Sequence, residues 1–311
     1  MFDDVYVEGH GACTALALAA LATLDDAGLL APRRRVTCYS MASVLAVAMA
    51  LGASPRALLR RATESGLQRL GAPTLVACAL LRGARLRLSA RLLALIDACG
   101  VGPELTMGAL HERSGHRVRV LVACAATART YVVDERSAPA ALVRDVLLAS
   151  CAIPGVFEFD GVLFDGAIFG GFGDAALEPG PGALVIGARC GVRAPTLQLV
   201  AAYRTLLSKL QAEWRAAALA RGAEVLLLRA GGDEPLHVRS VDGLYAYGAS
   251  RTIRWISSRL DARAEPRRAD ARTYSDASGG EEQSRSSRPS GVSSDAASSS
   301  AAMSPTRVTS V

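Results

Sequence analysis

The stretch Arg35-Val-Thr-Cys-Tyr-Ser40-Met-Ala-Ser43 decides the fold, because a short β-branched run ends on a serine and an apolar, helix-patterned segment follows at once. This order predicts a strand, a tight turn and a helix, with Ser40 at the turn. A turn of this kind exposes the serine hydroxyl at a sheet edge, near the positive end of the helix dipole. The simpler alternative is that Ser40 only caps the helix.

The residues around the serine have to be small, because strand and helix nearly touch there. The usual elbow has glycine two positions before and two positions after the nucleophile, whereas this chain has Cys38 and Ala42. Both side chains are small, so the pattern still favours a nucleophile elbow at Ser40, although neither residue is glycine.

A glycine-containing loop follows the first expected strand, and its sequence is Glu8-Gly-His-Gly-Ala-Cys-Thr14. A glycine turn between a strand and a helix leaves backbone N–H groups free to hold a phosphate or an oxyanion. The loop can equally be a plain tight turn. A reacting group nearby would decide between the two interpretations.

Composition predicts one folded domain and one tail. The chain has 311 residues, half of them hydrophobic, which is enough for one large core. Beyond about Arg263 the sequence is rich in small and polar residues and buries too little to offset its ordering entropy. We therefore expect a folded domain over residues 1–262 and a disordered tail over 263–311.

The charge pattern argues against a nucleic-acid-binding protein. The net charge of +6 comes almost entirely from arginine, acidic residues are interspersed, and aromatic residues make up 5% of the chain. Stacking platforms for nucleic acid need more aromatic side chains and a concentrated basic face. A diffuse attraction to anionic lipid headgroups stays open.

Seven scattered cysteines without C-x-x-C or Cys/His spacing predict reduced core residues, no metal site and an intracellular protein. The longest apolar run, Ala12–Leu24, has only about two thirds of the roughly 20 residues that a bilayer crossing requires. It also follows acidic rather than basic residues, unlike a signal peptide. We therefore expect a cytoplasmic protein without a transmembrane segment that can contact a membrane peripherally.

Hydrophobic periodicity predicts an α/β fold, in which a helical crossover joins the strands at 183–187 and 224–228. The turn signature Asp160-Gly161 predicts a hairpin between 157–159 and 162–164. The other expected strands are 4–7, 116–124 and 130–134. The expected helices run to about 30, to about 51, and over 54–70, 88–98, 103–112, 138–148, 197–220 and 245–259.

Taken in order, these segments resemble the patatin-like phospholipases, over roughly Phe2–Arg259. The family's oxyanion loop S-G-G-G-x-[KR]-G falls on Glu8–Thr14, where two glycines match and Cys13 replaces the basic residue. Its elbow G-T-S-A-G-S falls on Cys38–Ser43, where both serines match. Its segment A-S-x-A-I-P-G-x-F is reproduced in Ala149–Phe157, and its D-G-[GA] motif matches Asp165-Gly166-Ala167.

The resemblance implies a three-layer sandwich with a mostly parallel central sheet flanked by helices. It also implies a lipid acyl hydrolase that acts on phospholipids or acylglycerols through an acyl-enzyme intermediate, without metal or cofactor. Ser40 would be the nucleophile and Asp165 the general base. The backbone N–H groups of Gly9, His10 and Gly11 would form the oxyanion hole.

Two alternatives stay open from the residues. His237 lies late in the chain, where an ordinary Ser-His-Asp hydrolase carries its histidine. Alternatively, the chain is a catalytically inactive patatin-fold protein that binds lipid or a protein partner. In that case Ser40 would serve as a helix cap and Asp165 as a turn residue.

Overall fold

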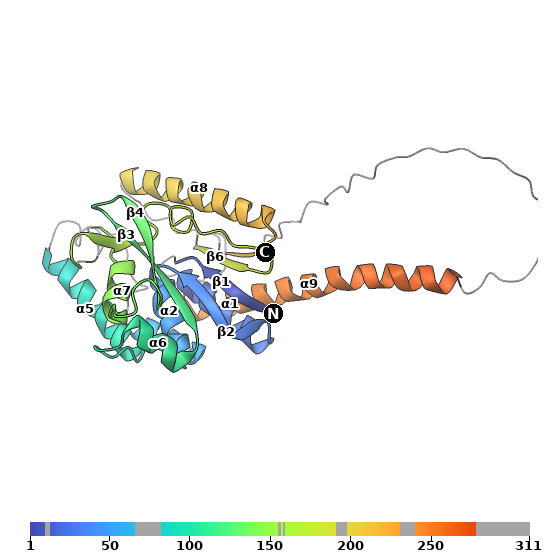
Figure 1. Ribbon diagram of the computed structural model, residues 1–311, viewed down its shortest axis with the longest axis horizontal. Coiled ribbons are helices and arrows are strands. Elements are labelled where there is room, and N and C mark those ends of the chain that lie inside the picture. Colours follow the sequence, from blue (N-terminus) through green and yellow to red (C-terminus); the bar gives the residue numbers. More distant parts are fainter. Residues whose placement is uncertain are drawn as a thin grey trace, which may run out of the picture.

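A mixed β-sheet forms the centre of the molecule in the computed structural model (Figure 1), which describes residues 1–9, 13–65, 82–154, 157, 159–190, 198–230 and 240–277. The spatial order of the strands is β4-β3-β2-β1-β6-β7, and β5 also pairs with β3. The pairs β1–β2, β2–β3, β1–β6 and β6–β7 are parallel, while β4 and β5 are antiparallel to β3. The strands are β1 (Phe2–Val7), β2 (Leu30–Cys38), β3 (Arg117–Cys124), β4 (Arg129–Val133), β5 (Leu163–Asp165), β6 (Leu184–Cys190) and β7 (Glu224–Ala230).

Helices cover both faces of the sheet (Figure 1). One face packs on α8 through a smaller core that contains Tyr6, Tyr39, Phe172 and Trp214. The larger core lies on the other face, beneath α1, α2, α5, α7 and the first part of α9. The helices are α1 (Thr14–Asp26), α2 (Met41–Ala50), α3 (Pro55–Ser65), α5 (Arg82–Ala98), α6 (Met107–Ser114), α7 (Val143–Ser150), α8 (Gln198–Ala220) and α9 (Val241–Ala277).

This architecture confirms the predicted α/β class, with a mostly parallel sheet between helical layers. The helix that joins β6 to β7 is the crossover expected from the sequence. The strand order changes direction at β1, which has β2 on one side and β6 on the other. In open α/β sheets, ligands bind beyond the carboxyl ends of the strands at such a switch point.

Several elements differ from the predicted ones. The helices predicted to begin at 88, 103 and 138 begin at Arg82, Met107 and Val143 instead. The first helix ends at Asp26 rather than near residue 30, because Gly28 turns the chain with a φ of 64° and β2 begins at Leu30. The predicted hairpin around Asp160-Gly161 is wrong at its first arm, since the described residues 157 and 159 are not in a strand. Its second arm pairs with β3 instead, because the Asp160 carboxylate accepts hydrogen bonds from Val162 and Leu163 and forms a local turn.

Helix α9 continues to Ala277, past the predicted helix end at Arg259 and the predicted domain boundary. It packs beside α1 and then extends beyond the sheet (Figure 1). Residues 278–311, most of the segment predicted to be a disordered tail, lie outside the described residues. The predicted division into a domain and a tail therefore stays a prediction.

The cysteine prediction is wrong at one position, because Cys13 forms a disulfide bond. Cys38, Cys99, Cys124 and Cys151 are free, and three of them are buried. Among the described residues, no helix combines the length and the apolar composition that a bilayer crossing would need.

Candidate functional site

Ser40 occupies a strained turn between β2 and α2. Its φ of 56° and ψ of −144° lie outside the regions that residues with a Cβ adopt readily, and such a conformation costs on the order of 1–3 kcal/mol. Its side chain makes no capping hydrogen bond to α2, so the alternative of a simple N-cap serine is wrong. This backbone conformation is typical of a strand-to-helix nucleophile elbow, and helix capping by the Ser40 side chain does not account for it.

Small side chains fill the positions where the usual elbow has glycine. Cys38 and Ala42 are both buried. The thiol of Cys38 points to the carbonyl oxygen of Arg119 at 3.7 Å. The sharp turn at Ser40 therefore forms with a Cβ at both flanking positions.

The backbone of Ser40 is held from two sides. Its carbonyl oxygen accepts hydrogen bonds from the Ser43 hydroxyl at 2.6 Å and from the Ser43 amide at 2.9 Å. Its amide donates to Oγ of Ser150 at 3.0 Å. The second serine of the elbow motif thus fixes the turn, while the hydroxyl of Ser40 takes part in none of these bonds.

Gly9 lies directly against the elbow. Strand β1 pairs with β2 as far as Val7 opposite Cys38, so the residues after these two ends run side by side. A Cβ added at Gly9 would lie 2.1 Å from the carbonyl oxygen of Tyr39 and 2.6 Å from Cβ of Ser40. Only glycine fits here, and the backbone of the predicted oxyanion loop therefore begins in contact with Ser40.

Asp165 is the last residue of β5. This strand pairs with β3 along the edge to which β2 pairs earlier in β3. Strand β2 pairs with β3 as far as Cys38 opposite Val120, whereas Asp165 stands opposite Val122. Because β4 occupies the other edge of β3 along this length, β5 must lie on the edge that β2 vacates. The chain turns into α2 after β2 ends, and Asp165 occupies the edge of β3 just beyond that end.

The end of α7 connects these two positions. Oγ of Ser150 accepts from the Ser40 amide and donates to the carbonyl oxygen of Leu121 at 2.8 Å. Two residues later, the carbonyl oxygen of Ala152 accepts from the Asp165 amide at 3.1 Å. This is the segment that resembles the family motif A-S-x-A-I-P-G-x-F, and it holds the backbones of Ser40 and Asp165 in a fixed relation.

The Asp165 carboxylate is buried, with 4% of the residue exposed, and Oδ1 accepts a hydrogen bond from the Ala167 amide at 2.9 Å. Gly166 lets this turn approach β3, because a Cβ there would lie 2.6 Å from the carbonyl oxygen of Leu121.

Burial and the Asp165 charge raise the pKa of the Cys151 thiol well above its usual value. Burial also raises the pKa of Cys38. Both thiols stay protonated at neutral pH and do not compete as nucleophiles.

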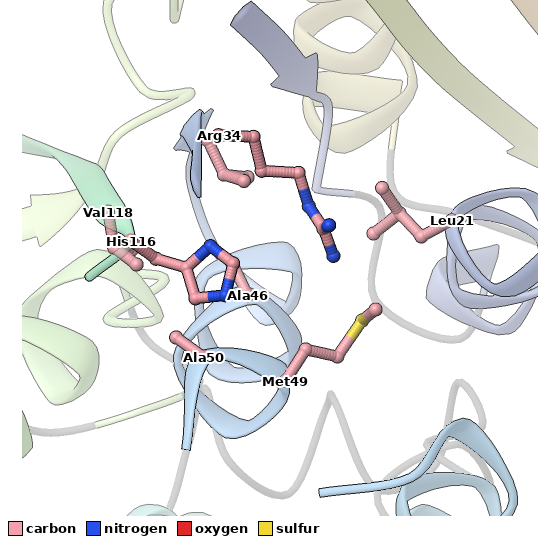
Figure 2. Close-up of a pocket in the computed structure, with 8 residues that line it drawn as sticks. Leu21, Arg34, Ala46, Met49, Ala50, His116 and Val118 are labelled. Carbon is pink, nitrogen blue, oxygen red and sulfur yellow. The ribbon is translucent and has the colours of Figure 1, made fainter. Parts of the chain in front are cut away.

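Two of the four histidines lie at the opposite edge of the sheet. His116 directly precedes β3, at the amino ends of the parallel strands, whereas Ser40 follows a carboxyl end. It lines a small cavity of about 10 Å³ beside Arg34 and Met49 (Figure 2), with room for about one water molecule. Burial and the Arg34 charge lower the pKa of His116. Nδ1 of His111 lies 2.9 Å from the His116 carbonyl oxygen, so neither ring is near Ser40.

Of the predicted site residues, Gly9 lies against Ser40, and the segment at the end of α7 bonds to the backbones of both Ser40 and Asp165. His10, Gly11 and the alternative base His237 lie outside the described residues. Ser150 is not among the predicted site residues, although a hydroxyl residue at the end of a largely apolar helix is a usable signal. In the part of the chain that the structure describes, no group of three or more potential metal ligands is found.

No protein-family model and no curated protein matches the sequence. Among solved structures, VipD from Legionella pneumophila aligns with 83% of this chain and 67% of its own, at 13% identity and a TM-score of 0.45. The type III effector protein ExoU aligns with 81% of this chain and 53% of its own, at 13% identity and a TM-score of 0.41. ExoU in its heterodimeric complex with SpcU, from the type III secretion system of Pseudomonas aeruginosa, aligns with 84% and 52%, at 16% identity and a TM-score of 0.42. The chain thus spans about half the length of ExoU.

Proposed function

We propose that this chain is a lipid acyl hydrolase that cleaves carboxylic ester bonds of phospholipids or acylglycerols. The observation that carries the proposal is the strained turn at Ser40, which Gly9 contacts and whose amide bonds to the segment at the end of α7 that also holds the amide of the buried Asp165. Backbone strain of this kind persists only where the surrounding structure imposes it, and it concentrates at functional sites.

In the proposed mechanism, Oγ of Ser40 attacks the ester carbonyl carbon while the Asp165 carboxylate takes its proton. The amide of Gly9, with those of His10 and Gly11, donates hydrogen bonds to the oxyanion of the tetrahedral intermediate. The C–O bond to the alcohol then breaks, and the alcohol leaves with the proton from Asp165. Asp165 next takes a proton from a water molecule, whose oxygen attacks the acyl carbon. The bond between the acyl carbon and Oγ of Ser40 then breaks, the fatty acid is released, and Asp165 returns the proton to Oγ.

Support for this mechanism comes from three features. The dipole of α2 points its positive end at the turn, where negative charge would develop. The Ser40 hydroxyl is not engaged in capping. The Asp165 carboxylate is almost fully buried, which would exclude bulk water from the proton transfer.

A lipid substrate is proposed from the family resemblance and from apolar side chains near Asp165. Ile153 is 39% exposed and directly follows Ala152, whose carbonyl oxygen holds the Asp165 amide. Val162 is 44% exposed and directly precedes β5. We propose that these side chains contact the aggregated lipid from which the substrate enters.

A fluorophosphonate probe tests the proposed function, because it phosphonylates activated serines. We expect the full chain to be labelled and Ser40→Ala to abolish the label at an unchanged melting temperature. A folded protein that is not labelled and does not hydrolyse a soluble ester would favour the alternative, an inactive protein with the same fold that binds lipid or a protein partner.

Replacing Ile153 and Val162 by serine should lower hydrolysis of phospholipid vesicles about tenfold, because it removes apolar surface that would enter the lipid interface. Hydrolysis of a soluble short-chain ester should stay within about twofold. Ile253→Ser is the matched control, since Ile253 is 55% exposed on α9 and remote from Asp165 in sequence. Equal loss on both substrates would show that the two residues act on the site itself and not on lipid contact.

A further inference from the structure

A buried ion pair lies next to the predicted oxyanion loop. Nη1 of Arg215 donates hydrogen bonds to both carboxylate oxygens of Glu8, at 2.5 and 2.7 Å. The Glu8 side chain is 0% exposed and that of Arg215 is 6% exposed. The two residues are 207 positions apart, so the pair joins α8 to the residue that follows β1. Helix α8 lies along one face of the sheet (Figure 1).

The pair acts on the backbone that meets the elbow. Glu8 directly precedes Gly9, and the Glu8 amide donates to the carbonyl oxygen of Ile186 at 3.0 Å. Gly187 leaves room for the carboxylate, because a Cβ there would lie 2.9 Å from Oε2 of Glu8. Main chain on one side and Arg215 on the other therefore fix the residue from which the loop departs.

The same helix also holds the residue before Ser40. Nε2 of Gln211 donates to the Tyr39 hydroxyl at 2.8 Å, and the Tyr39 ring packs edge-on against Phe172 at 5.0 Å between ring centres. Gln211 and Arg215 are one helical turn apart, on one face of α8. Helix α8 therefore bonds to both Glu8 and Tyr39, the residues that directly precede Gly9 and Ser40.

Stability alone is a weak reason for such a pair. Replacing a buried ion pair by apolar side chains of similar volume is often neutral or stabilising, because desolvating two charges offsets their attraction. The same balance applies to this pair, because both of its side chains are buried. Its place beside Gly9 points to a role in geometry, since displacing a reacting group by about 1 Å can lower a rate about 100-fold.

We propose that Arg215 is a positioning residue, which acts through Glu8 to hold the Gly9 amide where it can meet the oxyanion formed at Ser40. Arg215 touches no substrate in this arrangement. The inference rests on the proposed hydrolase function and extends the site to α8, which the sequence motifs do not include.

The test uses Arg215→Met and Arg215→Lys in the full chain, with kcat and KM for a soluble ester, the rate of fluorophosphonate labelling and the melting temperature. At an assay temperature well below the melting temperature of the variant, we expect Arg215→Met to lower kcat and the labelling rate by at least tenfold. Its KM should stay within about twofold of the wild-type value. Arg215→Lys should recover part of kcat, because an ammonium group retains the charge and one hydrogen bond to Glu8.

Arg221→Met is the matched control. Arg221 directly follows α8, six positions after Arg215, and pairs with Glu178 at 3.0 Å on the surface, so its loss should leave kcat unchanged. If Arg215 has only a structural role, the folded variants should have a lower melting temperature but full kcat. That result overturns the inference about Arg215 and leaves the proposed hydrolase function standing. If Arg215→Met does not fold, kcat of Arg215→Lys decides in the same way. An unlabelled, inactive wild type overturns the proposed function and the inference together.

Discussion

Asp165→Asn is expected to lower kcat for a soluble ester by about 10²- to 10⁴-fold, the range that a general base contributes. An amide cannot take the proton of the Ser40 hydroxyl. Its oxygen can still accept the hydrogen bond from the Ala167 amide that Oδ1 accepts at 2.9 Å, so the turn should persist. Steady-state kinetics together with thermal unfolding check both parts, and the melting temperature should change by no more than a few degrees.

Asp160→Asn is the control for this prediction. Asp160 lies five positions earlier and accepts two backbone hydrogen bonds in an exposed turn, so the same chemical change should leave kcat within about twofold. Persistent turnover in Asp165→Asn would rule out Asp165 as the base. The remaining candidate would be His237, which lies outside the described residues.

Gly9→Ala is expected to be the most damaging change of a single methyl group. The added Cβ would lie 2.1 Å from the Tyr39 carbonyl oxygen and 2.6 Å from Cβ of Ser40, so the backbone of β1 or of the elbow must move. Overpacking of this kind costs about 1–3 kcal/mol of stability. It also separates the oxyanion donor from the nucleophile, so kcat should fall about 100-fold or more, beyond any loss of folded protein.

Gly102→Ala is the matched control for steric crowding, because no atom lies within 4 Å of a Cβ built there. Its melting temperature and kcat should equal those of the wild type. If Gly9→Ala kept wild-type kcat, the loop that Gly9 begins would not be the oxyanion hole.

Local patterns in the sequence predicted most of the elements. Periodicity gave the strands around 4–7, 116–124 and 183–187, and the small residues around Ser40 indicated the elbow. What they could not supply was the partner of each strand. Asp160-Gly161 is a strong local hairpin signal, yet β5 pairs with β3, because that edge is free beyond the end of β2. This non-local choice places Asp165 on the edge of β3 just beyond the end of β2.

The supports of the site also depend on contacts between distant residues. Ser150 reaches the Ser40 amide across 110 positions, and Arg215 reaches Glu8 across 207. A single sequence shows that such residues are polar within apolar segments, but not which partner satisfies them. The sequence identifies the motif Ala149–Phe157 as a segment, whereas its physical role depends on the bonds by which Ser150 and Ala152 hold the backbones of Ser40 and Asp165.

The most direct measurement for this account is a crystal structure of the chain after reaction with a fluorophosphonate. If Ser40 is the nucleophile and Asp165 its base, phosphorus should be bonded to Oγ of Ser40, with the Asp165 carboxylate about 2.6–3.2 Å from Oγ. The phosphoryl oxygen should lie about 2.7–3.1 Å from the Gly9 amide nitrogen. An adduct on another residue, or an Asp165 carboxylate that faces away from a modified Ser40, would contradict it.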